Sequence, residues 1–158
     1  MTQQKPFNWY GNEDAVAFVG MKADSSIDVC DTFASEGGVN PGEAVIRGTD
    51  AAKQCKAVAA TGDGAKIVGI AVHVHREPQL TASAKYYEAG YTLPVMTSGD
   101  IYVAAGGDVK AGDTVALTIA GGKGVFVASS TAGAEKVANM TYLDSGVKDD
   151  LVRVRVRN

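Results

Sequence analysis

Two histidines spaced two residues apart are the clearest candidates for metal chemistry in this 158-residue chain. On a β-strand, His73 and His75 would point to the same face, and Glu77 could add a carboxylate ligand. The chain has only two histidines, which excludes a three-histidine site. We therefore expect the pair to lie at the end of a buried strand, facing solvent or a partner, and we predict no metal and no cofactor.

The other motifs that could support catalysis are incomplete. The stretch Gly62-Asp63-Gly64-Ala65-Lys66 lacks the spacing of a phosphate-binding loop, and we expect a hairpin turn there. The sequence shows no serine nucleophile elbow and no recognisable pairing of a cysteine with a histidine. Cys30 and Cys55 are expected to be reduced, mostly buried thiols. The sequence therefore does not predict an enzyme.

One pattern favours a different class of protein. Val109-Lys110-Ala111-Gly112-Asp113-Thr114-Val115 fits a turn-and-strand pattern that also occurs in lipoyl and biotinyl carrier domains. Such domains carry their modified lysine at a hairpin tip, within Asp-Lys-Ala or Met-Lys-Met, and neither tripeptide occurs in this chain. Lys123, in Gly-Gly-Lys-Gly, is the comparable tip lysine. A small β-barrel binding or lipoyl/biotinyl-like carrier module stays as the alternative function, which an adduct in the intact mass would reveal.

Aromatic side chains gather near the N-terminus, where Phe7, Trp9 and Tyr10 follow Pro6. They could fold back onto the chain's own β domain. They could also anchor an arm on a neighbouring molecule, because Trp and Tyr are favoured anchors in interfaces. We predict these three residues as partner-binding residues.

Arginines alternate with valines at the other end of the sequence. Arg153, Arg155 and Arg157 would lie on one face of a strand, and the intervening valines would lie on the other face. The arginines could simply point into water, where exposed charges contribute little to stability. They could also bind an acidic partner surface, and we predict them as partner-binding residues.

The charge is unevenly distributed along the chain. The formal net charge is −3, and residues 1–50 carry three basic and eight acidic side chains, a net charge of −5. Without a general basic surface, the sequence does not predict nucleic-acid binding. The longest apolar run, 67–74, contains His73 and falls short of the roughly 20 residues that cross a membrane. Neither a membrane span nor a secretory signal is predicted.

Composition indicates a β protein. Glycine accounts for 19 residues, and valine outnumbers leucine twenty to five, which favours pleated strands between tight turns. We predict an all-β fold, a compact β-barrel or sandwich of about eight or nine short, mostly antiparallel strands. A Gly/Pro-rich cluster at 36–42 divides an extended, loop-rich N-terminal arm (1–40) from the β domain (41–158). The predicted strands are 43–47, 54–60, 66–75, 91–97, 100–104, 114–120, 124–129, 138–143 and 149–157.

The order of turn and strand motifs resembles a known family. The motifs are Pro41-Gly42-Glu43-Ala44-Val45, Ile67-Val68-Gly69-Ile70-Ala71, Tyr87-Glu88-Ala89-Gly90-Tyr91-Thr92-Leu93-Pro94-Val95, Ser98-Gly99-Asp100-Ile101-Tyr102-Val103 and Val109 to Val115. In order and spacing they resemble the structural cement (capsid decoration) proteins of tailed bacteriophages over about residues 40–130.

This resemblance implies a function for the chain. It implies a β-rich protein, made in the host bacterial cytoplasm, that binds the outside of the phage capsid and stabilises the lattice of major capsid protein. It also implies a homo-oligomer, with a trimer favoured over a dimer, and neither enzymatic activity nor a cofactor. The expected partner is the major capsid protein, without direct contact to nucleic acid or membrane.

Overall fold

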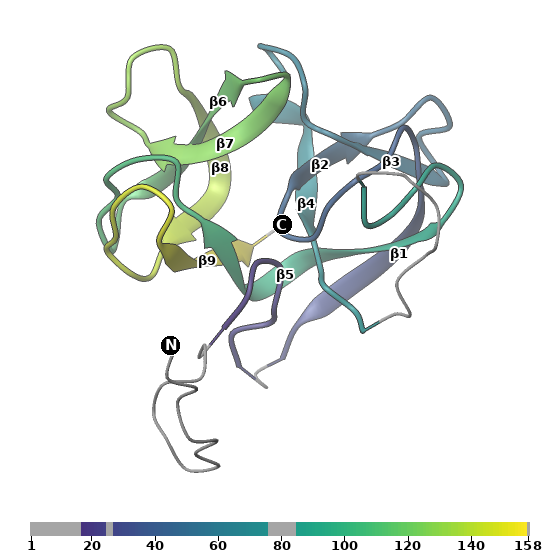
Figure 1. Ribbon diagram of the computed structural model, residues 1–158, viewed down its shortest axis with the longest axis horizontal. Helices are drawn as coiled ribbons and strands as arrows, with labels where there is room; N and C mark the ends of the chain where they lie inside the picture. The colour runs from purple at the N-terminus through teal and green to yellow at the C-terminus, as the bar shows by residue number, and fades with distance from the viewer. Residues whose placement is uncertain (1–16, 25–26, 76–84, 158) are drawn as a thin grey trace, which may run out of the picture.

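The computed structural model describes residues 17–24, 27–75 and 85–157, and the regular secondary structure of these residues is dominated by β-strands joined by turns and loops (Figure 1). One short 3₁₀ turn, η1 (Gly64–Lys66), precedes β4, and none of the described residues forms a helix able to cross a membrane. The predicted all-β class with eight or nine mostly antiparallel strands is confirmed. The strands are β1 (Val29–Ser35), β2 (Ala44–Arg47), β3 (Gln54–Ala57), β4 (Ile67–Ala71), β5 (Thr92–Ala104), β6 (Thr114–Ala120), β7 (Lys123–Ala128), β8 (Glu135–Tyr142) and β9 (Leu151–Arg157).

Five of the strands close a barrel. The order is β1-β3-β2-β4-β5, and β1 pairs with the first half of β5 to complete the circle. The β1–β3 pairing is parallel, whereas the other pairings of this barrel are antiparallel. A buried apolar cluster fills its interior: Phe33, Val39, Val45, Cys55, Ala71, Tyr87, Leu93 and Val95.

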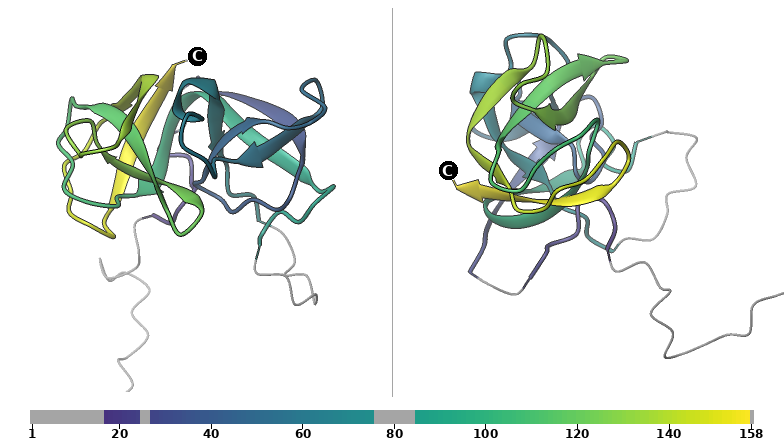
Figure 2. Two further views of the ribbon diagram at one scale, coloured as in Figure 1. Left: turned by 90° about the horizontal axis from the view of Figure 1, so that it is seen from above. Right: turned by 90° about the vertical axis from the view of Figure 1, so that its left-hand side faces the viewer.

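The remaining strands repeat the same arrangement. From Ser98 onward, β5 pairs with β9, and the order continues through β8, β6 and β7. A parallel bridge between Ala105 and Phe126 then connects β7 to the end of β5. This bridge is equivalent to the parallel pairing of Ser35 with Cys55, which joins β1 to β3 in the first barrel. We call β1–β4 with residues 92–98 the first unit, and residues 98–104 with β6–β9 the second unit. They lie side by side and share β5 (Figure 2).

The register of the two units is also the same. Residues paired across the first unit are matched, strand for strand, by residues paired across the second. One such row is Ala44, Ile70, Met96 and Cys30 in the first unit, against Thr114, Thr141, Arg155 and Asp100 in the second. The turns before β2 and β6 match as well, with Gly42 and Gly112 at φ of 77° and 89°. The chain is therefore an internally duplicated β protein.

The outer face of the first unit packs against the second unit. Ala44, Ile46 and Ile70 belong to one buried cluster with the interior of the second unit, which includes Phe126 and Val154. Since β2 and β4 also face the barrel interior, both of their faces are buried. This explains why their sequences are continuous apolar runs and do not alternate.

The structure differs from the predicted strands within β5. Residues 91–97 and 100–104 were predicted as separate strands, but β5 runs through Ser98 and Gly99 without a turn. A β-carbon at Gly99 (φ 133°) would lie 2.8 Å from that of Asp28, so only glycine fits this crossing. Within the predicted arm, Val29–Ser35 forms β1 and Val39 is fully buried. Residues 1–16 lie outside the described residues.

Candidate functional site

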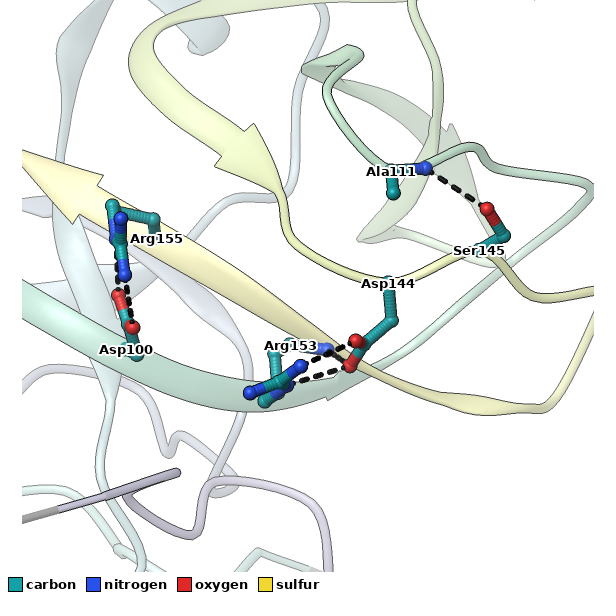
Figure 3. Close-up of polar contacts among 6 residues, drawn as sticks. All are labelled: Asp100, Ala111, Asp144, Ser145, Arg153 and Arg155. Carbon is teal, nitrogen blue, oxygen red and sulfur yellow. Dashed lines mark hydrogen bonds and ion pairs between the residues drawn. The ribbon is translucent and has the colours of Figure 1, made fainter.

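The arginine face on β9 is the largest predicted site that the structure describes (Figure 3). Val152, Val154 and Val156 are buried, and the three arginines point to the opposite face of the sheet. Their neighbours on β5 are Tyr102, Asp100 and Ser98, which pair with Arg153, Arg155 and Arg157. The predicted alternation places the valines in the core and the arginines at the surface, as the two-residue period requires.

Two of the arginines form bidentate ion pairs within the chain. Arg153 donates from Nε and Nη2 to Asp144 at 2.9 and 2.7 Å, and its backbone N–H also donates to that carboxylate. Arg155 donates in the same manner to Asp100 at 2.8 and 2.7 Å. The Asp100 side chain is only 6% exposed, whereas the Arg155 side chain is 40% exposed. Planar guanidinium groups suit this fork geometry, so both side chains are held in fixed positions.

The ion pairs shift the ionisation of their members. Hydrogen bonding from Arg153 lowers the pKa of the Asp144 carboxyl below its ordinary value. The Asp144 and Asp100 carboxylates raise the pKa values of Arg153 and Arg155, which stay protonated throughout the physiological range. The two pairs are therefore neutral, oriented hydrogen-bonding groups on the surface.

Arg157 lies beside a shallow hollow at the end of β9. The hollow has a volume of about 390 Å³ and is lined by Ile27, Ser98, Gly99, Asp100, Arg155, Val156 and Arg157. The Ile27 side chain is 96% exposed, the highest value among the exposed large apolar residues of the described chain. The hollow thus places the exposed apolar side chain of Ile27 beside the guanidinium groups of Arg155 and Arg157.

The other predicted site residues fall into different places. Phe7, Trp9 and Tyr10 lie outside the described residues, and so does Glu77. His73 follows the end of β4 and packs between the rings of Phe18 and Tyr86, with centroid distances of 4.6 and 5.1 Å.

Groups that could perform chemistry are dispersed over the described residues. No group of three or more metal-ligating side chains comes together in this part of the chain. Cys30 and Cys55 are free thiols, and burial raises the pKa of each. Lys123 begins β7 after the Gly121-Gly122 turn and is exposed. The described surface carries ion pairs such as Arg153–Asp144 and individually exposed large apolar residues such as Ile27.

Comparison with known proteins identifies the family. The family model "Structural cement protein (E217 gp24/Pam3 gp6)" matches residues 6–157. The chain belongs to the phage structural cement protein family. The resemblance inferred from the turn and strand motifs is confirmed, and a cement protein is a structural protein of the virion, located on the capsid, with a decorating and stabilising role.

One solved structure supports the fold of this cement protein. It is similar to a chain in "The capsid of Myoviridae Phage XM1", with a TM-score of 0.69 and 17% identity over 98% of this chain and 99% of that chain. A second similar structure is "The crystal structure of head fiber gp8.5 N base in bacteriophage phi29", with a TM-score of 0.44 and 15% identity over 82% of this chain and 94% of that chain. Among curated proteins, none matches this chain.

Proposed function

We propose that this cement protein binds the outer surface of the assembled major capsid protein lattice as a homo-oligomer, with a trimer favoured over a dimer, and acts without catalysis. The match of the cement family to residues 6–157 carries the proposal. The family is one of structural phage proteins, and this supports a binding role over an enzymatic one.

Stabilisation follows from mass action. A protein that binds the assembled lattice and not its separated subunits lowers the free energy of the assembled state by RT ln(1 + [L]/Kd) for each site. At a free concentration 100 times Kd, this is about 2.7 kcal/mol per site. A capsid presents many identical sites, so a modest contact at each one adds up over the shell.

We propose the arginine face and the N-terminal aromatic residues as the contact surfaces. Arg153 and Arg155 are already oriented by their carboxylate partners, so they lose little conformational freedom on binding. Arg157, at the hollow beside Ile27, supplies the charge for an acidic residue of the partner. Phe7, Trp9 and Tyr10 would anchor an arm on capsid protein or a neighbouring copy.

Binding to capsids that lack the protein tests the proposal directly. Purified protein is mixed with expanded, undecorated capsids, the capsids are sedimented, and the bound copies are counted against the capsid protein. We expect saturable binding and a higher temperature of capsid disruption in the decorated sample. Protein that stays in the supernatant at concentrations far above those in an infected cell would contradict the proposal.

Variants separate the contributions of the surfaces. An Arg157→Glu substitution is expected to weaken capsid binding, whereas Lys110→Glu, at an exposed position on the turn before β6, serves as the matched charge reversal. Deleting residues 1–12 tests the arm, and undiminished binding of that variant would refute its role. The mass of the free protein in solution, measured by sedimentation equilibrium, tests the trimer.

A further inference from the structure

The duplication creates two equivalent sheet edges, and the chain covers one of them. In the second unit, this edge is the side of β5 that faces away from β9. Gly20 donates its N–H to the carbonyl of Tyr102 at 2.8 Å, and Tyr102 donates to the carbonyl of Met21 at 2.9 Å. Ala23 donates to the carbonyl of Asp100 at 2.8 Å. Residues 20–23 therefore form an antiparallel addition to this edge, beside β5 (Figure 1).

The matching edge of the first unit lies on β1. In the first unit, Cys30 pairs with Met96 and Thr32 pairs with Pro94. In the second unit, Asp100 pairs with Arg155 and Tyr102 pairs with Arg153 at the matching positions. Cys30 is therefore the counterpart of Asp100, and Thr32 is the counterpart of Tyr102. These counterparts are separated by 70 residues in the sequence.

The backbone groups of Cys30 and Thr32 point away from β5. Ala34 donates its N–H to the carbonyl of Lys53, next to β3, and alternate residues of a strand share one side. However, β3 pairs with β1 only at Ala34 and Ser35. In the described part of the chain, no backbone hydrogen bond reaches the outer edge of Cys30 and Thr32. We call this edge the open β1 edge.

The side chains around the open β1 edge are apolar and acidic. Ile27 and Val29 are among the exposed large apolar residues, at 96% and 49% exposure. Asp31 is exposed and forms no ion pair with the described residues, whereas Asp28 is paired with Lys22. Lys22 belongs to the segment that covers the second unit. The chain thus shows that a short strand fits the matching edge of the second unit, and that a lysine of this strand forms an ion pair with Asp28, just before β1.

We propose that the open β1 edge binds an extended segment of the major capsid protein, which adds as an antiparallel strand and carries apolar and basic side chains. The backbone of the segment would hydrogen-bond to Cys30 and Thr32, its apolar side chains would cover Ile27 and Val29, and a lysine or arginine would face Asp31. The inference rests on the proposed function, because it names the contact through which the capsid is bound.

Charge and pairing disfavour other copies of this chain as the occupant. The basic strand β9 already pairs with β5 on one side and β8 on the other. Residues 1–16 contain one basic residue, Lys5, against Glu13 and Asp14. Two copies of the chain could also pair through their β1 edges, antiparallel and with Cys30 of one copy opposite Thr32 of the other. This arrangement would place the Asp31 residues of the two copies opposite each other, and like charges in that position repel.

Cross-linking identifies the occupant. Thr32→Cys is made in a Cys30→Ser background, labelled with a thiol-reactive photocross-linker, bound to capsids and illuminated. Asp108→Cys in the same background, at an exposed position in the second unit, is the matched control. We expect a cross-link from position 32 to one segment of the capsid protein, identified by mass spectrometry. A cross-link to another copy of this chain, equal yields from both positions, or no cross-link from position 32 would overturn the inference.

Two edge variants give an independent measurement. Thr32→Pro removes an outward N–H, a position where an edge strand tolerates proline, and Asp31→Lys reverses the charge. We expect each to weaken capsid binding about tenfold or more, the usual size of effect for a lost strand or charge contact. Asp31→Lys changes only an exposed side chain, so it keeps the test decisive if Thr32→Pro lowers the melting temperature.

The outcomes separate this inference from the proposed function. If the wild-type protein binds capsids and both edge variants bind as tightly, the open β1 edge is not the contact and the proposed function stands. If the wild-type protein does not bind capsids, the proposed function itself fails.

Discussion

Replacing Gly69 by alanine tests the close approach of β4 and β5 within the first barrel. A β-carbon at this position would lie 2.1 Å from the backbone oxygen of Met96 and 2.8 Å from a methyl group of Val95. An ordinary contact begins at about 3.4 Å, so the two strands would have to separate by roughly 1.3 Å. The obstacle is backbone of a paired strand, and it cannot rotate away as the end of a flexible side chain could.

The cost can be estimated from what this separation disrupts. The β4–β5 pairing consists of Ile70 with Met96 and Ala71 with Val95, all fully buried. Weakening two buried hydrogen bonds costs about 1 kcal/mol each, and overpacking a core costs about 1–3 kcal/mol. We therefore expect Gly69→Ala to lower the free energy of unfolding by about 3 kcal/mol or more, which lowers Tm by about 6–12 °C in a chain of this size.

Urea unfolding, followed by circular dichroism, measures this effect against a matched control. Gly107→Ala introduces the same methyl group at a position where nothing lies within 4 Å and where φ is not in the left-handed region. Its free energy of unfolding should stay within about 0.5 kcal/mol of the wild type. Equal midpoints for the two variants would refute the reasoning from the close approach of the strands.

Three further predictions concern ionisation, a buried hydroxyl and thiol access. Because Arg153 lowers the pKa of Asp144, this pair stabilises the fold above the unfolded pKa of about 3.9, and the gain disappears as pH falls through the folded pKa. Asp144→Asn should therefore destabilise at pH 7 and have less effect at pH 2 in urea titrations; an equal loss at both values would contradict this. Tyr142→Phe removes a hydroxyl that donates to a carbonyl of β7 at 3.0 Å, and should cost about 1–2 kcal/mol in the same assay. With a colorimetric thiol reagent, half-buried Cys30 should react slowly in the native protein and fully buried Cys55 only on unfolding; simultaneous reaction of both in the native state would exclude this account.

Local patterns were sufficient to predict most strands. The alternation in β9 was correctly interpreted because one face is buried and the other is not. Gly121 and Gly122 correctly indicated the β6–β7 hairpin, since both have the positive φ that a tight turn requires. These signals depend on a few consecutive residues, so they can be recognised without knowledge of the tertiary structure.

β1 was not predicted because most of its side chains are polar or exposed. Only Phe33 and Ser35 are buried, whereas Val29, Asp31 and Thr32 are exposed. The strand is specified by its pairing with β5, about 60 residues away, and not by its own hydrophobic pattern.

The duplication has a weak signal in the sequence. Val39, Gly42 and Glu43 recur as Val109, Gly112 and Asp113 at a spacing of 70 residues. Later in the chain, the counterpart of Gly90 is Asp149, at a spacing of 59 residues, because the first unit has a longer connection before β5. A changed spacing and a lost glycine hide the repeat from a search at constant period.

The arginine face shows a similar division between local and long-range information. The common orientation of its arginines follows from the two-residue period, but their partners do not. Asp100 is 55 residues from Arg155 and lies beside it only because β5 pairs with β9. The partner-binding role of this face stays a prediction.

The duplication also explains why the two units have different outer faces. In the first unit, this face is apolar and packs on the second unit, while three of the corresponding positions of the second unit carry polar side chains. The matched pairs are Ala44 and Thr114, Ile70 and Thr141, and Met96 and Arg155. Repeat proteins need a polar face on the terminal repeat, because an apolar one would recruit further copies. The arginine face thus ends the repeat, because it does not offer the apolar surface on which a further unit would pack. A face with two oriented ion pairs and the guanidinium group of Arg157 can still bind an acidic partner, so ending the repeat and contacting the capsid are compatible roles for the same residues.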